Sequence, residues 1–335
     1  MARTSASFSR LPHLPQTYCT LFALKNRSAL RSAALFGIAP RMNSKLRYFL
    51  RSAMLMASPS RRACPNCAGS GRIVSRKYVV TALRRCNECA LLYRTPTDRP
   101  DEAERFYNES YEQGTAMDLP SPAELEVMKA QQFGAMNNDY TKFSEFLREL
   151  EVPKGGRLFE YGCSWGYGSW VFTQHGYDVK SYEIARDRRE YGVHHLGVNL
   201  TNDFERFVNE NAGTFDAFFS SHVLEHVPSP SAIIDAALKL LKPGGVLLSV
   251  VPNGSDSWRR ADPESWRQLW GMVHPNFIDE LYLTRALGSV SSIIWAWPAS
   301  IDDDALAHLN TGAAGTQLLG ALDRYELFVA ARKPH

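Results

Sequence analysis

Four of the six cysteines lie in two pairs whose spacing suits a metal ion. The pairs are CPNC, with Cys64 and Cys67, and CNEC, with Cys86 and Cys89, and 18 residues separate them. Zn²⁺ prefers thiolate ligands in a tetrahedron, and each Cys-x-x-Cys turn supplies two of them. The pattern predicts a structural zinc site, because four sulfur ligands leave no open position for water. Four unligated thiols are the alternative.

A glycine-rich turn follows a short apolar run in RLFEYGCSWGYGSW, residues 157–170. The run ends at Glu160, and Gly162, Gly166 and Gly168 come before a helical pattern. Glycines let a ligand lie against bare backbone, where the N–H groups of a helix start point at it. The spacing differs from the Gly-x-Gly-x-x-Gly of a dinucleotide site. Alone, it also suits an ordinary tight turn.

An acidic residue, Glu183, closes the strand expected after this turn. It lies about twenty residues after the first glycine, where a carboxylate can accept two hydrogen bonds from a ribose diol. The alternative is a solvated acid at the end of a strand. The position therefore predicts a nucleoside contact only in combination with the turn.

The elements around these residues alternate between strand and helix patterns. We expect strands at 157–161, 178–182, 198–200, 215–220, 246–251, 291–297 and 324–332, and helices at 166–175, 186–195, 231–241 and 277–287. Residues 298–320 read as irregular. Repeated strand–helix units predict an α/β, doubly wound, Rossmann-like parallel sheet with helices on both faces. Its ligand crevice lies at the carboxyl ends of the strands.

The chain of 335 residues has room for one such domain and a smaller module. We expect an extension at 1–60, a zinc-binding module at 61–95, a linker and helical cap at 96–150, and the main domain at 151–335. The net charge of +3 conceals an asymmetry, because residues 1–63 hold eleven basic and no acidic residues. From residue 101 onward 33 acidic residues face 20 basic ones. This acidic main domain argues against a nucleic-acid partner.

The basic N-terminal segment has three interpretations. It is an extension without structural weight, a transit-like targeting peptide, or, around residues 45–53, a basic amphipathic helix on a membrane surface. No apolar run reaches the length of a transmembrane helix. We expect a cytoplasmic protein, with organelle targeting as the alternative; the oligomeric state is not readable.

Taken together, four segments resemble class I S-adenosylmethionine-dependent methyltransferases. They are FEYGCSWGYG, the Tyr-Glu pair at 182–183, FDAFFSSHVLEHVPSP and LKPGGVLLSVVPN, and the likeness covers roughly residues 155–255. The cysteine module is similar to the N-terminal zinc-binding part of one branch, whose members often modify sugars or other small molecules in bacteria. Ser164 departs from the family pattern, because many members have glycine there.

The resemblance implies a seven-stranded sheet whose final strand is antiparallel. It implies that Glu160, Gly162 and Gly166, with Gly168 beside them, cradle the methionine end of the cofactor. It also implies that Glu183 holds the ribose and that Asp203 and Phe204 border the adenine. The expected cofactors are S-adenosyl-L-methionine and structural Zn²⁺.

Three histidines are candidates for catalysis. The sulfonium of the cofactor is already electrophilic, so alignment of the acceptor is the main task, and a general base helps with a hydroxyl or an acidic carbon. His222 follows the fourth strand, His226 lies in the same loop, and His274 precedes the next helix. Each could instead orient a loop or pack a helix start.

The sequence thus predicts a methyltransferase acting on a small-molecule acceptor, such as a sugar, a nucleotide-sugar or a secondary metabolite. One alternative is an RNA methyltransferase whose zinc module and basic arm bind phosphate. Another is a methyltransferase-like scaffold without activity. The acceptor atom, O, N or C, stays open.

Overall fold

The computed structural model describes residues 50, 52–56, 58–77, 79–99, 102, 119–134, 136, 139–271 and 273–335. The chain divides into two units, residues 1–46 and 47–335, and all described residues belong to the second. The targeting, extension and membrane-helix hypotheses rest mainly on residues outside the described ones. Most of the expected linker, around residues 100–118, also lies outside the described residues.

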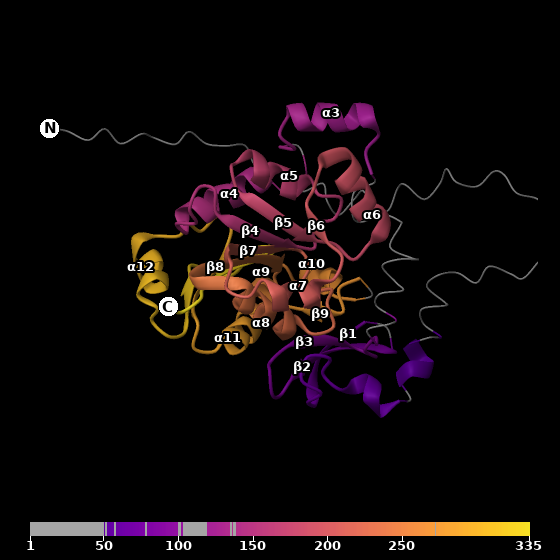
Figure 1. Cartoon of the computed structure of the whole chain (residues 1–335). Coiled ribbons are helices and arrows are strands. Elements are labelled where there is room, and N and C mark those ends of the chain that lie inside the picture. The colour runs from indigo at the N-terminus through magenta and orange to yellow at the C-terminus, as the bar shows by residue number, and fades with distance from the viewer. Residues whose placement is uncertain are drawn as a thin grey trace, which may run out of the picture. The chain divides into compact units, whose positions relative to one another are not determined.

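The main sheet has eight strands in the order β11-β10-β12-β8-β7-β4-β5-β6. Figure 1 labels β4 to β8 of this sheet. Its strands are β4 (Arg157–Tyr161), β5 (Asp178–Tyr182), β6 (Leu200–Thr201), β7 (Phe215–Ser221), β8 (Leu241–Pro252), β10 (Ser291–Ala296), β11 (Thr316–Leu319) and β12 (Glu326–Arg332). All neighbours pair in parallel except β12, which is antiparallel to β8 and to β10. The expected α/β class and the antiparallel final strand are confirmed.

The sheet has one strand more than the seven expected. β11 adds to the outer edge by pairing in parallel with β10, and α12 (Asp303–Thr311) precedes it. Both elements lie in 298–320, which the sequence pattern presented as irregular. Asp302 caps α12 by accepting the N–H of Ala305 at 2.8 Å. The sequence analysis did not identify this helix start, because Asp302 lies in a run of acidic residues.

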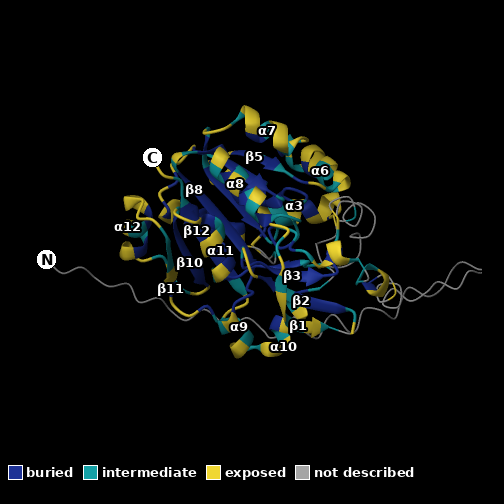
Figure 2. Ribbon diagram, turned by 90° about the horizontal axis from the view of Figure 1, so that it is seen from below, coloured by how far each residue is buried: buried dark blue, intermediate teal, exposed yellow. Residues whose placement is uncertain are grey.

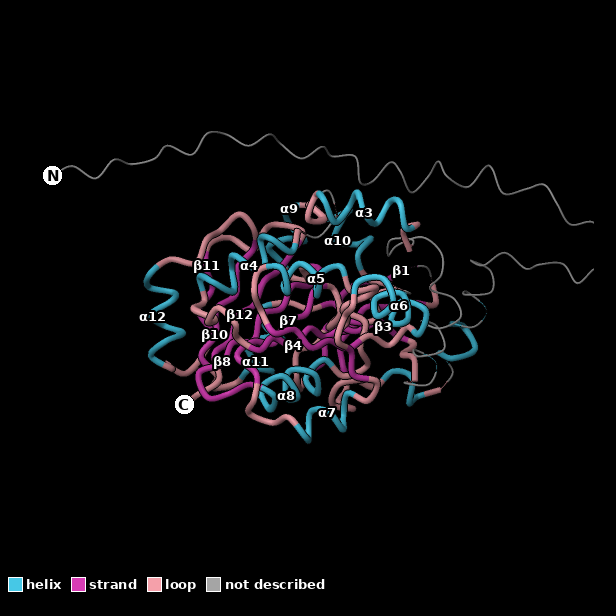
Figure 3. The backbone as a smooth tube through the Cα atoms, turned by 45° about the horizontal axis from the view of Figure 1, so that its top comes forward, coloured by secondary structure: helices cyan, strands magenta, loops and turns pink. Residues whose placement is uncertain are grey.

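Helices cover both faces of this sheet (Figure 3). They are α3 (Pro122–Ala130), α4 (Tyr140–Glu149), α5 (Tyr167–Gln174), α6 (Arg186–Tyr191) with the π-helical turn Gly192–Leu196, α7 (Phe204–Glu210), α8 (Pro230–Leu240) and α11 (Glu280–Leu287). Two further helices, α9 (Asp256–Ala261) and α10 (Pro263–Leu269), follow β8 and pack with Leu83, Leu92 and Phe277 instead. Residues of α4, α5 and α12 share one core with the sheet, and residues of α7, α8 and α11 share the other. The strands are buried while the outward helix faces are exposed (Figure 2).

The expected helical cap is partly a core element. Phe143, Phe146, Leu147 and Leu150 are all buried against the sheet, because α4 places them on one face at helical spacing. α3 begins with a capping box formed by Ser121 and Glu124. Packing, rather than a pocket wall, is therefore the role of the apolar face of α4.

The cysteine module forms a second, antiparallel sheet in the order β1-β2-β3-β9. Its strands are β1 (Gly71–Lys77), β2 (Thr81–Cys86), β3 (Leu92–Thr95) and β9 (Asn276–Phe277). β9 comes from the main domain, so the two parts share a sheet. A buried ion pair between Arg85 and Asp279, 2.5 Å apart, adds to this junction. Asp279 also caps α11, which explains why this helix starts later than the expected residue 277.

Candidate functional site

The glycine turn follows β4 at the carboxyl edge of the sheet, as predicted. Gly162 and Gly166 have φ values of +81° and +89°, which side chains rarely adopt. A Cβ atom on Gly162 would overlap Val223, and one on Gly166 would overlap Val198. Both positions therefore need glycine for conformation and for space.

Gly168 has a different reason to be glycine. It lies inside α5, and a Cβ atom there would overlap the ring of Tyr140 from α4. Close packing of the two helices thus explains Gly168, whereas its expected contact with the cofactor stays a prediction.

Glu160 is the second-last residue of β4 and is only 1% exposed. It accepts a hydrogen bond from Ser169, whose hydroxyl also meets Ser181 at 2.8 Å. Burial raises the pKa of Glu160 to about 7, although Ser169 and Tyr140 oppose the shift. No donor among the described residues reaches hydrogen-bonding distance of its Oε1. That oxygen can accept an N–H group from a ligand.

Glu183 binds the backbone of the turn directly. Its two oxygens accept the N–H groups of Ser164 at 2.9 Å and of Ala185 at 2.8 Å. Burial raises the pKa of Glu183, and the two N–H groups act against this shift. The carboxylate is thus fixed beside the glycine turn, with lone pairs remaining for a diol.

Ser164 stands where many members of the family have glycine, and its backbone conformation is strained. Its φ is +53°, in the left-handed region, where a side chain is strained. Its hydroxyl accepts a hydrogen bond from Arg188 Nη1 at 2.7 Å, and its N–H serves Glu183. These bonds hold the turn in the shape that glycine would adopt freely.

Aromatic rings line the adjacent strand ends. Phe204 lies with its ring centroid 4.7 Å from that of Tyr161 and 5.4 Å from that of Tyr182. Asp203 caps α7 by accepting the N–H of Arg206 at 3.0 Å. The sequence analysis expected Asp203 and Phe204 at the adenine, which stays a prediction, and it assigned no role to the rings of Tyr161 and Tyr182, which directly precede Gly162 and Glu183.

A second group of ionisable side chains follows β7. His222 Nε2 lies 3.0 Å from Glu326 Oε1, and its Nδ1 lies 3.6 Å from Glu225 Oε1. Burial alone would lower the pKa of His222, but the two carboxylates outweigh it and raise the pKa to about 10. His222 is therefore an imidazolium near neutral pH. Glu326 starts the last strand, more than a hundred residues away in sequence, and the sequence analysis did not include it.

His226 and His274 meet at the other side of Glu225. Their ring centroids are 4.8 Å apart. His226 Nδ1 lies 2.8 Å from the carbonyl of Val273, and His274 Nδ1 lies 2.5 Å from the carbonyl of Leu269. Burial lowers the pKa of His226 and lowers that of His274 to about 4. Both rings are neutral at pH 7, unlike His222.

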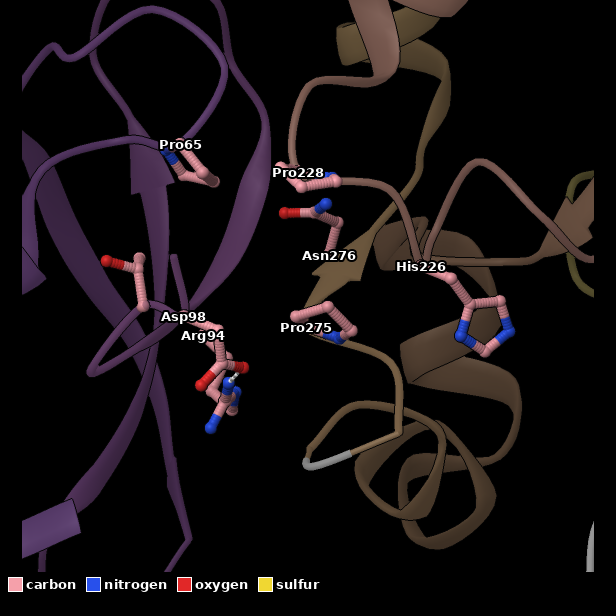
Figure 4. Close-up of a pocket in the computed structure, with 8 residues that line it drawn as sticks. Pro65, Arg94, Asp98, His226, Pro228, Pro275 and Asn276 are labelled. Atoms are coloured by element: carbon pink, nitrogen blue, oxygen red, sulfur yellow. Dashed lines mark hydrogen bonds and ion pairs between the residues drawn. The ribbon is translucent and has the colours of Figure 1, made fainter. Parts of the chain in front are cut away.

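The cysteine module holds the segment that carries His274. Arg94 of β3 donates its backbone N–H to the carbonyl of Pro275 at 2.7 Å, next to the pairing of β3 with β9. A small pocket opens between the two parts (Figure 4). It is lined by Pro65, Arg94, Thr97, Asp98, His226, Pro228, Pro275 and Asn276.

The four predicted cysteines converge. Cys64 Sγ lies 3.6 Å from Cys89 Sγ, Cys67 Sγ lies 3.4 Å from Cys86 Sγ, and all four sulfurs lie within 4.8 Å of one another. A tetrahedral Zn²⁺ with Zn–S bonds of about 2.3 Å separates its sulfurs by roughly 3.8 Å. The four thiols are unbridged and fit such an ion.

Comparison with known proteins gives a family for the middle of the chain. Residues 128–290 match a family described as "Methyltransferase domain". This range contains the glycine turn and all three histidines, but neither the cysteine cluster nor Glu326. Among the described residues, no helix is long and apolar enough to cross a membrane.

Two curated relatives share a name. The chain is similar to the ubiquinone biosynthesis O-methyltransferase of Xanthomonas axonopodis pv. citri, with 37% identity over 31% of this chain and 46% of that protein. It is 31% identical to the Psychrobacter arcticus protein of that name, over 31% of this chain and 44% of the relative. The chain thus spans less than half the length of these relatives.

Among solved structures, the chain is similar to geranyl diphosphate C-methyltransferase from Streptomyces coelicolor A3(2). The sequence identity is 15%, the match covers 71% of this chain and 99% of that one, and the TM-score is 0.43.

Proposed function

Because residues 128–290 belong to the methyltransferase domain family, we propose that this chain transfers a methyl group from S-adenosylmethionine to a small-molecule acceptor. One observation carries the proposal. The turn with Gly162 and Gly166 lies at the carboxyl edge of the sheet in a left-handed backbone conformation, and Glu183 accepts the N–H of Ser164 in that same turn. An uncharged backbone cradle beside a fixed carboxylate suits a nucleoside that has no pyrophosphate.

Different residues near the turn would bind different parts of the cofactor. The Oε1 atom of Glu160 would accept from the ammonium of the methionine part, because no donor among the described residues lies within hydrogen-bonding distance of it. Glu183 would accept from the ribose hydroxyls, and Asp203 with Phe204 would border the adenine beside the rings of Tyr161 and Tyr182. These assignments rest on complementary chemistry.

The bound cofactor supplies an electrophilic methyl group, so the protein has to position the acceptor and handle its proton. His222 already carries two protons and can donate but not accept while Glu225 and Glu326 stay ionised. The neutral rings of His226 and His274 are the groups at this end that can accept a proton or bind a cation.

The acceptor is proposed to be a small molecule with a hydroxyl group. The curated relatives are named for O-methylation in ubiquinone biosynthesis, which supports a hydroxyl acceptor. The acidic balance from residue 101 onward disfavours nucleic acid.

We also propose that the cysteine cluster binds structural Zn²⁺. Four sulfurs would fill the coordination sphere and stabilise a module whose short strands bury little on their own. Cys67→Ser should release the ion, measured by its content per chain, and should loosen β1–β3 to proteolysis. A fully stable Cys67→Ser chain without zinc would contradict a structural role.

Calorimetric titration with S-adenosylhomocysteine tests the proposed activity without knowledge of the acceptor. The wild type should bind, and Glu183→Ala should lose about 1.5–3 kcal/mol, or ten- to a hundredfold in affinity, since the ribose loses its acceptor. Glu145→Ala, which removes an exposed carboxylate from α4, is the matched control and should bind like the wild type. A well-folded wild type that does not bind would favour the scaffold.

A further inference from the structure

Glu225 is a carboxylate in an unusual position. It is 0% exposed, and no donor among the described residues lies within hydrogen-bonding distance of either oxygen. The nearest charged partners are His222 Nδ1 at 3.6 Å and His226 Nε2 at 3.7 Å. A buried carboxylate without hydrogen bonds is costly, so the charge of Glu225 has to be met by cationic partners, of which His222 is one.

The two histidines beside Glu225 have their tautomers fixed by backbone carbonyls. A carbonyl only accepts, so His226 Nδ1 donates to Val273 and His274 Nδ1 donates to Leu269. In the neutral rings the lone pair therefore lies on Nε2. Histidine ligands of metal ions nearly always donate their other N–H in this way, which fixes the ring and raises its basicity.

Three electron-pair donors thus converge on one point. One atom each from Glu225, His226 and His274 lie within 4.8 Å of one another. Three lone pairs that face one another in a buried site repel unless a cation lies between them. We propose that Glu225, His226 and His274 bind a divalent first-row transition ion, separate from the ion of the cysteine cluster.

The donor set defines the class of ion. Two imidazoles and one carboxylate suit Zn²⁺, Fe²⁺, Mn²⁺ or Co²⁺ better than Ca²⁺, which prefers oxygen ligands. With bonds of about 2.0–2.1 Å, ligand atoms sit roughly 3.3 Å apart, close to the 3.7 Å between His226 Nε2 and Glu225 Oε1. The widest separation in the cluster, up to 4.8 Å, has to shorten by about 1.5 Å.

Hydrogen bonds join the two segments that supply the three side chains. Asn276 donates its N–H to the carbonyl of Glu225 at 3.1 Å and its side-chain amide to that of Val227 at 2.6 Å. These bonds join the loop after β7 to the segment that carries His274. The three donors are therefore held together by the two chain segments that supply them.

Three protein ligands leave coordination positions open for the substrate. If the proposed function holds, an acceptor hydroxyl could take one of them, and the ion would lower the pKa of that hydroxyl. This use rests on the proposed function, whereas binding of the ion does not.

Metal counting on the full chain tests the proposal. Chain with its cysteine site loaded with Zn²⁺ is titrated with Zn²⁺, Mn²⁺ and Co²⁺ in turn, and the metal bound per chain is measured. We expect a second equivalent of at least one ion. Bound Co²⁺ at this site should show visible d–d bands without the sulfur-to-metal charge-transfer band of a thiolate site.

Variants assign the second equivalent. His274→Gln and Glu225→Gln should weaken it by at least about 100-fold, because each removes a ligand. His308→Gln is the matched control, since His308 in α12 also contacts a backbone carbonyl but lies outside the cluster. Circular dichroism checks folding, and His274→Gln carries the test if Glu225→Gln does not fold.

Three results would overturn the proposal. The first is a wild type that stops at a single equivalent with all three ions. The second is a second equivalent that survives in folded His274→Gln, and the third is one that His308→Gln also removes. Titration of the same samples with S-adenosylhomocysteine reports separately on the proposed function, because none of these variants alters Glu160 or Glu183.

Discussion

Two regions at the same sheet edge hold their carboxylates in opposite ways. After β4 and β5, Glu183 is satisfied by backbone N–H groups at 2.8 and 2.9 Å. At the end of β7, the carboxylates of Glu225 and of Glu326 from β12 face histidine rings, and no donor among the described residues lies within hydrogen-bonding distance of Glu225. The first region is built from backbone and the second from side chains of distant segments.

This difference separates two tasks. A backbone cradle with fixed donors suits a ligand that keeps its shape, such as a nucleoside. Side chains that can gain or lose a proton suit the place where a proton or an ion is handled. We therefore expect substitutions in the turn to weaken cofactor binding. We expect substitutions at the histidines to change how that region holds a proton or an ion.

The largest effect should come from the space at Gly162. Gly162→Ala combines a left-handed φ with an overlap on Val223 and should cost about 2–4 kcal/mol of unfolding free energy. Gly155→Ala is the control, because its φ is +79° but nothing lies within 4 Å of its Cβ, so about 1 kcal/mol is expected. Urea denaturation measures both. Equal losses would mean that the turn is not tightly packed.

The next effect concerns the ion pair at the other region. Glu326→Gln leaves the His222 imidazolium with Glu225 as its remaining acidic partner and should destabilise the fold by about 2–3 kcal/mol at pH 7. Affinity for S-adenosylhomocysteine should change little. Glu205→Gln, at an exposed position of α7, is the control. A loss of cofactor binding in Glu326→Gln would mean that the two regions do not have separate tasks.

The pH dependence of cofactor binding should report on Glu160. Its pKa is raised by burial to about 7, and only the ionised carboxylate attracts an ammonium group. Affinity for S-adenosylhomocysteine should therefore rise about tenfold from pH 6 to pH 8. In Glu160→Gln the rise should disappear. An affinity that falls over this range in the wild type would contradict the assignment.

The smallest effect should come from Ser164. Ser164→Gly relieves the strain of φ +53° but loses the bond from Arg188, so the net change should stay below about 1 kcal/mol. Ser164→Ala keeps the strain and loses the bond, so it should be the less stable of the two. Thermal melts compare them. The opposite order would mean that the turn is not strained.

Local sequence patterns predicted the glycine turn after β4 but not the ion pairs of His222. The strands at 157–161 and 178–182 match the expected bounds residue for residue, because strand, glycine turn and helix start are encoded in one continuous segment. His222 was proposed as a candidate from its position after the strand that is now β7. Its partner Glu326 comes from the last strand, and only the sheet order β12-β8-β7 brings the two side chains together.

Other differences arise from pairing over long distances. The strand expected at 246–251 begins instead at Leu241, since Phe215 of β7 pairs with it across an irregularity in register. β9 is two residues long and exists because β3 of the cysteine module binds it. Neither feature has a local sequence signal, because each depends on a partner strand.

A crystal structure of the chain with S-adenosylhomocysteine tests the central claim most directly. We predict the ribose hydroxyls within hydrogen-bonding distance of Glu183 and the amino group at Glu160 Oε1, with no contact to His274. A ligand bound away from Glu183, for example in the pocket lined by Arg94 and Asn276, would contradict the division between the two regions.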